Sequence, residues 1–363
     1  MASDAQSMRP DSPPDVSSAL SPVDRSARSA LARLLPSKLT PWRIVRVIGL
    51  AAALALLVAL IVHLGPRKIA SELLAAGPGF FWLLLLHAFA IGLSALPWHV
   101  LLPAAARPPL GRSIASRFVA AGANAVVPIV AFAGDLVRLW WLPRKSDRPA
   151  GVAAIIVDRL TYGAANVVTV LAGALALVHV SSLPPIYLRA ALMGAIALLL
   201  VVVIGMLVVR RYRMIGRIHR LIRRIRHKHP ENHFGDDADL HVERMLREPR
   251  GLALAFLANL ASRVAVSAEI YLAFWLLGVH LEWDQMLVFA ALPIVVAVAG
   301  ALVPSQIGVQ EGAQALVAAS FGIPATTAVA VVLLLRIRSL LGGFVVWFLL
   351  AQRSSHRDAL GRV

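Results

Sequence analysis

Two stretches of the sequence decide the fold: GANAVVPIVAFAGD at residues 122–135 and VAGALVPSQIGVQE at residues 298–311. Each stretch lies in hydrophobic sequence and contains a proline that an acidic residue follows seven positions later. The second stretch begins 176 residues after the first, at 298 rather than 122. A charge within hydrocarbon is costly and persists where it faces protein, water or an opposite charge. The duplicated pattern therefore indicates a membrane protein built from two repeats, with a translocation site between them.

A buried arginine follows each stretch inside the next apolar run. Arg159 follows the first stretch and Arg336 the second, so their offset, from 159 to 336, is 177 residues. An arginine cannot shed its proton to lower the cost of burial. The proline, the acid and the arginine at one common spacing support the repeat more strongly than the matching alanines and valines do, because those residues are frequent throughout the chain.

Composition places the whole chain among membrane proteins. The 363 residues are 59% hydrophobic, and the mean hydropathy is +0.75. Several runs reach the roughly 20 apolar residues that cross a bilayer. The net charge of +17 does not indicate nucleic acid, because the basic residues flank the apolar runs, where the positive-inside rule places them. The chain has no cysteine, which excludes disulfides, thiolate metal sites and a cysteine nucleophile.

The apolar runs predict an all-α polytopic membrane protein with about six transmembrane helices and two re-entrant hairpins. The predicted spans are 44–64, 77–103, 150–180, 187–209, 251–279 and 325–350. Two further segments, 113–142 and 285–322, contain Pro, Gly and acidic residues and are too interrupted for simple spans. Irregular backbone at membrane depth is tolerated where protein surrounds it, so each of these segments predicts a hairpin.

Charge bias predicts the orientation of these elements. The basic residues before 44, in the 210–250 loop and after 352 place both termini and that loop in the cytoplasm. The first hairpin then enters from the cytoplasm and the second from the opposite side, which makes the two halves an inverted repeat. The connection at 65–76, which carries Arg67 and Lys68, departs mildly from this scheme.

The predicted organisation has four parts. These are a disordered cytoplasmic tail at 1–40, a transmembrane domain at 41–352 with repeat halves at 44–180 and 187–350, a basic cytoplasmic loop at 210–250, and a short cytoplasmic tail at 353–363. Within the loop, residues 210–229 predict a basic amphipathic helix that lies on an anionic leaflet or anchors the topology. The localisation that follows is the cell inner membrane.

The candidate site residues are the polar groups within or beside the broken segments and spans. The candidates for binding or gating a substrate are Arg117, Asn124, Asp135, Arg138, Asp158, Arg159, Arg263, Glu311 and Arg336. The predicted structural breaks, with glycines expected to permit close backbone approach, are Pro128, Gly134, Pro304, Gly308 and Gly312. Five arginines, at 117, 138, 159, 263 and 336, are the candidates for a phosphate, because a guanidinium group can fork onto phosphate oxygens.

These residues also have structural interpretations. Arg159 and Arg336 could each neutralise an acid in an ion pair, or the acids could lie at hairpin ends beside interfacial water. His87 lies in the middle of a span and favours a structural role, and Arg338 favours a snorkelling side chain. No Gly-rich phosphate loop, metal motif or nucleophile elbow is present, so we expect no metal, no cofactor and no catalytic residues.

These motifs resemble the integral-membrane part of lysylphosphatidylglycerol synthase, a family of flippase-like proteins. The resemblance covers about residues 40–352. Its first signature is similar to Asn124, Pro128, Gly134–Asp135 and Arg138, and its second to Pro304, Gly308 and Glu311 with Arg336. Asp135 stands where the family usually has Glu, and Gln306–Ile307 where it usually has Gly-Gly. The family's soluble aminoacyl-transfer domain does not occur in this sequence, so lipid aminoacylation is not expected.

Three functions remain open at this point. The resemblance and the duplicated charges favour a flippase for a lipid or lipid-linked intermediate, with membrane lipids bearing an anionic or phosphate head group as partners. The alternatives are a non-transporting accessory protein of an envelope-lipid or glycosyltransferase pathway and, less favoured, a lipid-modifying enzyme. The sequence does not identify the lipid, the coupling ion or the oligomeric state.

Overall fold

The computed structural model describes most of the region between the two termini. The described residues are 66–126, 133–142, 147–179, 185–212, 215–217, 233–299 and 308–339, together with Val62 and Leu341. All of them belong to one compact unit, residues 49–363. The regular elements among these residues are helices, without any strand, which confirms the all-α prediction for the described part. The predicted terminal tails and both key prolines, Pro128 and Pro304, lie outside it.

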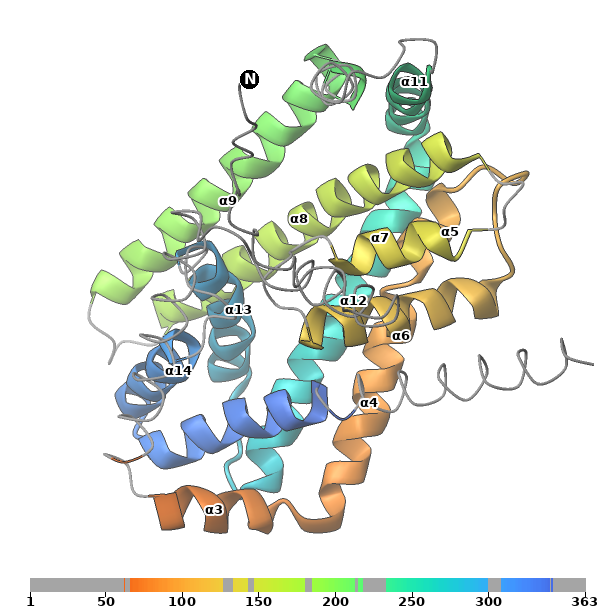
Figure 1. The fold of residues 1–363 in the computed structure, drawn as a ribbon. Coiled ribbons are helices and arrows are strands. Elements are labelled where there is room, and N and C mark those ends of the chain that lie inside the picture. Colours follow the sequence, from red (N-terminus) through yellow and green to blue (C-terminus); the bar gives the residue numbers. More distant parts are fainter. Residues whose placement is uncertain are drawn as a thin grey trace, which may run out of the picture. The chain divides into compact units, whose positions relative to one another are not determined.

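The helices fall on the two halves of the chain that the sequence predicted (Figure 1). The first half contains α3 (Pro66–Ala75), the 3-10 turn η2 (Gly77–Gly79), α4 (Phe80–Leu93), α5 (Leu96–Leu101), α6 (Leu110–Val126), α7 (Ala133–Trp140) and α8 (Arg148–His179). The second contains α9 (Pro185–Tyr212), α11 (Phe234–Arg247), α12 (Pro249–Leu276), α13 (Trp283–Ala299), α14 (Val309–Ser320) and a helix at 325–339. In each half one candidate membrane span, Gly77–Leu101 or Pro249–Leu276, precedes a pair of shorter helices, and another helix follows them.

Three helical stretches are long and apolar enough to cross a membrane: Gly77–Leu101, Arg148–Val178 and Pro249–Leu276. They coincide with three of the six predicted spans. Helix α9 covers the predicted span at 187–209, and the helix at 325–339 covers the beginning of the last. The predicted span at 44–64 lies almost entirely outside the described residues, so the total of six remains a prediction.

The two segments predicted as hairpins each contain a pair of helices. Helix α6 packs closely against α7, and α13 contacts α14. Helix α6 has 17 residues, and α7 has 8. At about 1.5 Å per residue neither reaches the roughly 30 Å of hydrocarbon. The connections between the helices, at 127–132 and 300–307, lie outside the described residues, and insertion of either pair from one side of a membrane stays a prediction.

Two predicted connections contain helices instead of simple loops. The connection at 65–76 is largely helix α3. The 210–250 loop contains α11, whose Val242 and Met245 side chains are buried in one cluster with Leu101, Ala154 and Ala255 from α5, α8 and α12. The apolar face of α11 is therefore docked onto the transmembrane helices. Most of the amphipathic helix predicted at 210–229 lies outside the described residues.

Helix α8 lies at the centre of the packing. It contacts α13, α9, α11 and α12, and at 32 residues it spans roughly 48 Å. Its inner face is formed by small residues such as Ala153, Ala154 and Ala165, which are fully buried. Small side chains let neighbouring helices approach closely in a membrane protein. This arrangement brings the middle of α8, with its ionisable residues, against α7 and α12.

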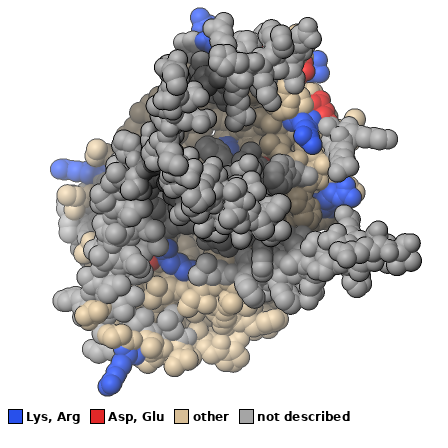
Figure 2. Space-filling model, viewed as in Figure 1, with Lys and Arg blue, Asp and Glu red and all other residues tan. Residues whose placement is uncertain are grey.

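The outer faces of the helices are apolar. Exposed hydrophobic side chains lie on α4, α8, α9 and α12, including Phe89, Leu175, Ile204 and Leu257. In Figure 2 the described surface in the lower part of the view is largely uncharged, and Lys and Arg side chains lie mainly around the edges of the view, at the upper right, the left and the lower left. A broad apolar surface with charge at its margin is what a lipid-facing exterior requires.

Candidate functional site

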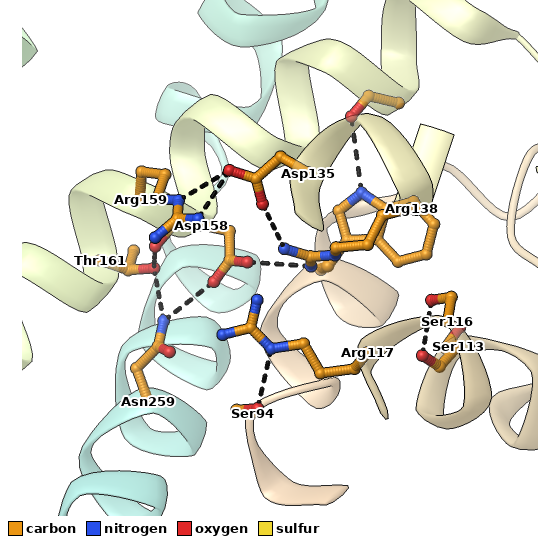
Figure 3. Close-up of polar contacts among 12 residues, drawn as sticks. Ser94, Ser113, Ser116, Arg117, Asp135, Arg138, Asp158, Arg159, Thr161 and Asn259 are labelled. Atoms are coloured by element: carbon orange, nitrogen blue, oxygen red, sulfur yellow. Dashed lines mark hydrogen bonds and ion pairs between the residues drawn. The ribbon is translucent and has the colours of Figure 1, made fainter. Parts of the chain in front are cut away.

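A buried cluster of charged side chains forms where α7 lies against α8 (Figure 3). The Asp135 carboxylate of α7 accepts hydrogen bonds from Arg159 Nε at 3.0 Å and Arg159 Nη2 at 2.6 Å. Its other oxygen lies 3.4 Å from Arg138 Nη1, one turn further along α7. Arg138 Nη2 in turn lies 3.0 Å from Asp158 Oδ2 on α8. Two arginines and two carboxylates thus alternate in one series of ion pairs, in which each charge contacts an opposite one.

A third helix completes the hydrogen bonding of Asp158. Asn259 Nδ2, on α12, donates to Asp158 Oδ1 at 3.2 Å and to Thr161 Oγ1 at 3.0 Å. Thr161 Oγ1 itself donates to the Asp158 carbonyl oxygen at 3.0 Å. A buried carboxylate retains its charge at low cost where several donors solvate it. Asn259, which is not among the candidates named from the sequence, is therefore part of the site.

Arg138 is enclosed by this arrangement. Its side chain is 1% exposed, and its guanidinium group lies 4.9 Å from the centre of the Trp98 ring, on α5. The Trp98 ring covers one face of the guanidinium group, while Asp135 and Asp158 contact its two terminal nitrogens. Arg138 belongs to the candidate site by position, but its contacts are those of a structural element.

Arg117 approaches the cluster from α6, and a break in the first candidate span makes room for its contact. The regular helical hydrogen bonding is interrupted at Ser94 and Ala95, which keep right-handed helical backbone angles, because the ring of Pro97 has no N–H to donate to the carbonyl group of Leu93. Arg117 Nε donates to Ser94 Oγ at 2.9 Å. The break therefore anchors the base of the guanidinium group between α4 and α5.

The two terminal nitrogens of Arg117 make no hydrogen bond or ion pair with any residue that the structure describes. They point from α6 toward the space beside Asp158 and Arg138 (Figure 3). The charges of Arg138, Asp158 and Arg159 all act on Arg117. With Arg117 included, the described cluster holds three guanidinium groups and two carboxylates. It therefore carries one positive charge without a described counter-charge.

A second acid–arginine pair lies in the other half of the chain. Arg336 Nε, on the helix at 325–339, lies 2.6 Å from Glu311 Oε1 on α14. The other oxygen, Glu311 Oε2, accepts a hydrogen bond at 2.7 Å from the backbone N–H of Gly308, which precedes the helix. Gly308 has φ 80°, a conformation that favours glycine. The carboxylate is fully buried, whereas the Arg336 side chain is 27% exposed.

A third group of ionisable residues, which the sequence analysis did not assemble, connects three helices. The fully buried Glu269, on α12, pairs with Arg338 and lies 3.3 Å from His87 Nδ1 on α4. Arg338 is 8% exposed, so the snorkelling interpretation is wrong: its charge is neutralised inside the protein. A glutamate in the middle of an apolar run was the available signal, since a buried acid requires a partner.

Arg263 has its own partner. Its guanidinium group lies 4.7 Å from the centre of the Tyr162 ring and donates to the Tyr162 hydroxyl group. Arg263 is on α12 one turn after Asn259, and Glu269 follows ten residues after Asn259. At 1.5 Å per residue, the first charged cluster and the Glu269 group are about 15 Å apart along this helix. Helix α12 thus contributes to both.

Some predicted residues have another outcome. Pro128 and Pro304 lie outside the described residues, as does the side chain of Asn124. Gly134 is buried beside Asp135. Close backbone approach is not found at Gly312, where an added Cβ atom would meet nothing within 4 Å among the described residues.

The three clusters of ionisable side chains are suited to keeping charged groups buried. Within the described residues no group of three His, Cys, Asp or Glu side chains could hold a metal ion, and no nucleophile lies beside a base in the clusters above. The fold and the clusters define a helical membrane protein with buried ionisable groups on its broken and neighbouring helices.

Comparison with family models identifies the family. Residues 46–346 match the model of the lysylphosphatidylglycerol synthase TM region. The chain belongs to this family, as the motifs around Asp135 and Glu311 predicted. No curated protein and no solved structure matches the chain.

Proposed function

We propose that this protein translocates a lipid, or a lipid-linked intermediate, whose head group carries a phosphate. Membership of the lysylphosphatidylglycerol synthase TM region family supports a membrane protein that handles lipids. The charged cluster between α6, α7, α8 and α12 is the proposed head-group site. The observation on which the proposal rests is the guanidinium group of Arg117, whose two terminal nitrogens have no partner among the described residues.

The contacts in the structure favour one of the five arginines that the sequence suggested as phosphate-binding candidates. Four of them already have partners: Arg138 contacts two carboxylates, Arg159 contacts Asp135, Arg263 contacts Tyr162, and Arg336 contacts Glu311. Arg117 differs, because only its Nε atom is bonded within the described part of the chain. A guanidinium group with both terminal nitrogens open can donate two parallel hydrogen bonds to phosphate oxygens.

Electrostatics favours the same ligand. The described cluster has one more guanidinium group than carboxylates, so an anion placed beside Arg117 would complete its charge balance. Asp135 and Asp158 hold Arg138 and Arg159 in place, and the same carboxylates would repel an anion that approached them directly. The head group is therefore expected on the α6 side of the cluster.

The proposal includes the inverted arrangement of the two halves. The common helix order and the pairs Asp135–Arg159 and Glu311–Arg336 support a duplicated unit. With both termini in the cytoplasm of a bacterial inner membrane, the two pairs would belong to hairpins that enter from opposite sides. Alternating exposure of such a site to the two leaflets is how many repeat-built transporters work. No catalytic step forms part of the proposal.

The test is a lipid-translocation assay in liposomes. The purified protein is reconstituted with an acyl-labelled fluorescent anionic phospholipid, and a membrane-impermeant quencher reports how fast label from the inner leaflet becomes accessible. We expect Arg117→Gln to slow translocation roughly tenfold or more, since a hydrogen bond to a charged group contributes about 1.5–3 kcal/mol. Arg117→Lys should be intermediate, because it keeps the charge and loses the fork.

The control is Arg112→Gln, which removes an exposed arginine from the same helix. It should leave the rate unchanged. A wild-type rate equal to that of protein-free liposomes would contradict translocation and favour the accessory role. A wild-type rate that Arg117→Gln does not reduce would contradict the placement of the head group.

A further inference from the structure

The Gln314 side chain, on α14, has no hydrogen-bond partner among the described residues for either of its polar atoms. Gln314 is fully buried, and neither Nε2 nor Oε1 makes a hydrogen bond within the part of the chain that the structure describes. Nearly all buried polar side-chain atoms in proteins are hydrogen-bonded to protein or to ordered water. A buried amide with both its donor and its acceptor free is therefore an exception that requires a cause.

The position of Gln314 in the repeat is informative. The offset of 176 that relates Asp135 to Glu311 also relates Arg138 to Gln314. The offset of 177 that relates Arg159 to Arg336 relates Asp158 to Leu335. The ion pair between Arg138 and Asp158 thus has no ionic counterpart in the second half. An amide and a leucine occupy the corresponding positions.

This replacement leaves the amide without the partner that its counterpart has. Arg138 contacts Asp158 at 3.0 Å, whereas Leu335 has no polar side-chain atom to offer Gln314. An apolar residue at position 314 would satisfy the packing without an unpaired polar group. A glutamine here is explained if a group outside the protein chain completes its hydrogen bonds.

We infer that Gln314 and the neighbouring Glu311–Arg336 pair form a site for a neutral hydroxyl-bearing group. An amide offers one acceptor and two donors without charge, and a hydroxyl group, which both donates and accepts, complements it. Glu311 already forms an ion pair with Arg336 and accepts a hydrogen bond from the Gly308 N–H, so the charges there are balanced and an ion is not required. The partly exposed Arg336 side chain connects the buried residues to the surface.

The hydroxyl oxygen can belong to a lipid head group or to water. If it belongs to the head group, the site rests on the proposed function and extends it: Arg117 binds the phosphate, and Gln314 recognises a polyol or sugar hydroxyl at another stage of translocation. If it belongs to water, the site is part of the protein's internal hydration. The chemistry at Gln314 is the same in both cases.

The experiment compares two lipids that differ in hydroxyl groups alone. Phosphatidylglycerol and phosphatidylpropanol share the phosphate and the charge, and only the first has hydroxyl groups beyond the phosphate. Binding of each lipid to the full chain in detergent is measured by native mass spectrometry, and thermal unfolding is followed in parallel. The variant is Gln314→Met, which keeps the length of the side chain and removes the amide. The matched control is Gln310→Met, on the same helix.

If a lipid hydroxyl group occupies the site, the wild type should bind phosphatidylglycerol more tightly than phosphatidylpropanol, by about tenfold for two neutral hydrogen bonds. Gln314→Met then reduces this ratio to about one, and Gln310→Met leaves it unchanged. If a water molecule occupies the site, the wild type should show no preference between the two lipids, and Gln314→Met should have a lower unfolding temperature in both. Gln314→Leu also removes the amide and gives the same comparison if the methionine variant does not fold.

An unchanged lipid ratio together with an equal or higher unfolding temperature for Gln314→Met would overturn the inference, because the amide would then be an unsatisfied group without a ligand. This result is distinguishable from failure of the phosphate site. Arg117→Gln should weaken the binding of both lipids equally, whatever happens at Gln314.

Discussion

The two halves of the chain each contain a buried acid–arginine pair and differ in the polar residue one turn after the acid. In both, an acid on a short helix pairs with an arginine on the helix that follows it: Asp135 with Arg159, and Glu311 with Arg336. One turn after the acid, the first half has Arg138, which is neutralised by a second carboxylate. The second half has Gln314, whose amide has no partner among the described residues.

The difference separates two roles of buried polar groups. The acid–arginine pair occurs in both halves, so it is the part of the pattern that the scaffold itself requires. The position one turn later varies between an ion that is held by the protein and a neutral amide that is not. We infer that the common pair maintains the packing of the short helix, while the variable position and Arg117 give each half its own ligand chemistry.

The largest effect should come from converting the first half into the second. Arg138→Gln leaves Asp135 and Asp158 buried with too little positive charge, and breaking a buried pair in this way costs about 3–5 kcal/mol. Adding Asp158→Leu reproduces the arrangement at Gln314 and Leu335 and should recover most of the loss, because both members of the pair are then absent. The measurement is unfolding in detergent for both single variants and the double variant.

The double variant decides the outcome. A loss in the double variant equal to the sum of the single losses would mean that Arg138 and Asp158 do not act as a pair. The two halves would then differ for a reason other than the exchange of an ion pair for an amide and a leucine.

An intermediate effect is expected at the pair that the halves share. Glu311→Gln keeps an acceptor for the Gly308 N–H but no longer neutralises Arg336. Because the Arg336 side chain is 27% exposed and can turn toward polar surroundings, the loss of stability should be about 1–3 kcal/mol, less than for Arg138→Gln. The double variant Glu311→Gln with Arg336→Gln isolates the coupling energy, and unfolding in detergent measures it. A loss as large as that at Arg138 would show that the two pairs are equally enclosed.

The smallest effect concerns the backbone before α14. Gly308 has φ 80°, so Gly308→Ala should cost about 1–2 kcal/mol, the usual cost of left-handed backbone for a residue with a Cβ atom. Gly312 lies within the helix and has open space around its Cβ position among the described residues, so Gly312→Ala should stabilise by about 0.5–1 kcal/mol. The two variants should shift the unfolding temperature in opposite directions. Shifts in the same direction would contradict the different backbone roles given to Gly308 and Gly312.

The sequence predicted the elements better than their contacts. Hydrophobic runs predicted the three helices that are long and apolar enough to cross a membrane, because length and composition are local properties. The common offsets singled out Asp135, Arg159, Glu311 and Arg336, and left open whether each acid pairs with an arginine. The structure places both pairs within hydrogen-bonding distance, while their role in binding stays a prediction.

What the sequence could not provide was the direction in which side chains face. Glu269, Arg338 and His87 are distant in sequence and meet because of how α4, α12 and the helix at 325–339 are rotated about their axes. Gln314 was missed for another reason: a glutamine is uncharged and attracts no attention in an apolar run. Its significance emerges once its burial and its missing partner are known.

Helix α12 has a mechanical consequence for the two halves. It provides Asn259 to the cluster around Asp158 and Glu269 to the group around Arg338, about 15 Å further along the same axis. An unbroken helix resists compression, so a shift along its axis moves both side chains by the same amount. A shift that opened the cluster around Asp158 would therefore strain the group around Arg338 at the same time. In the proposed transporter, α12 would then couple the movements of the two clusters to each other.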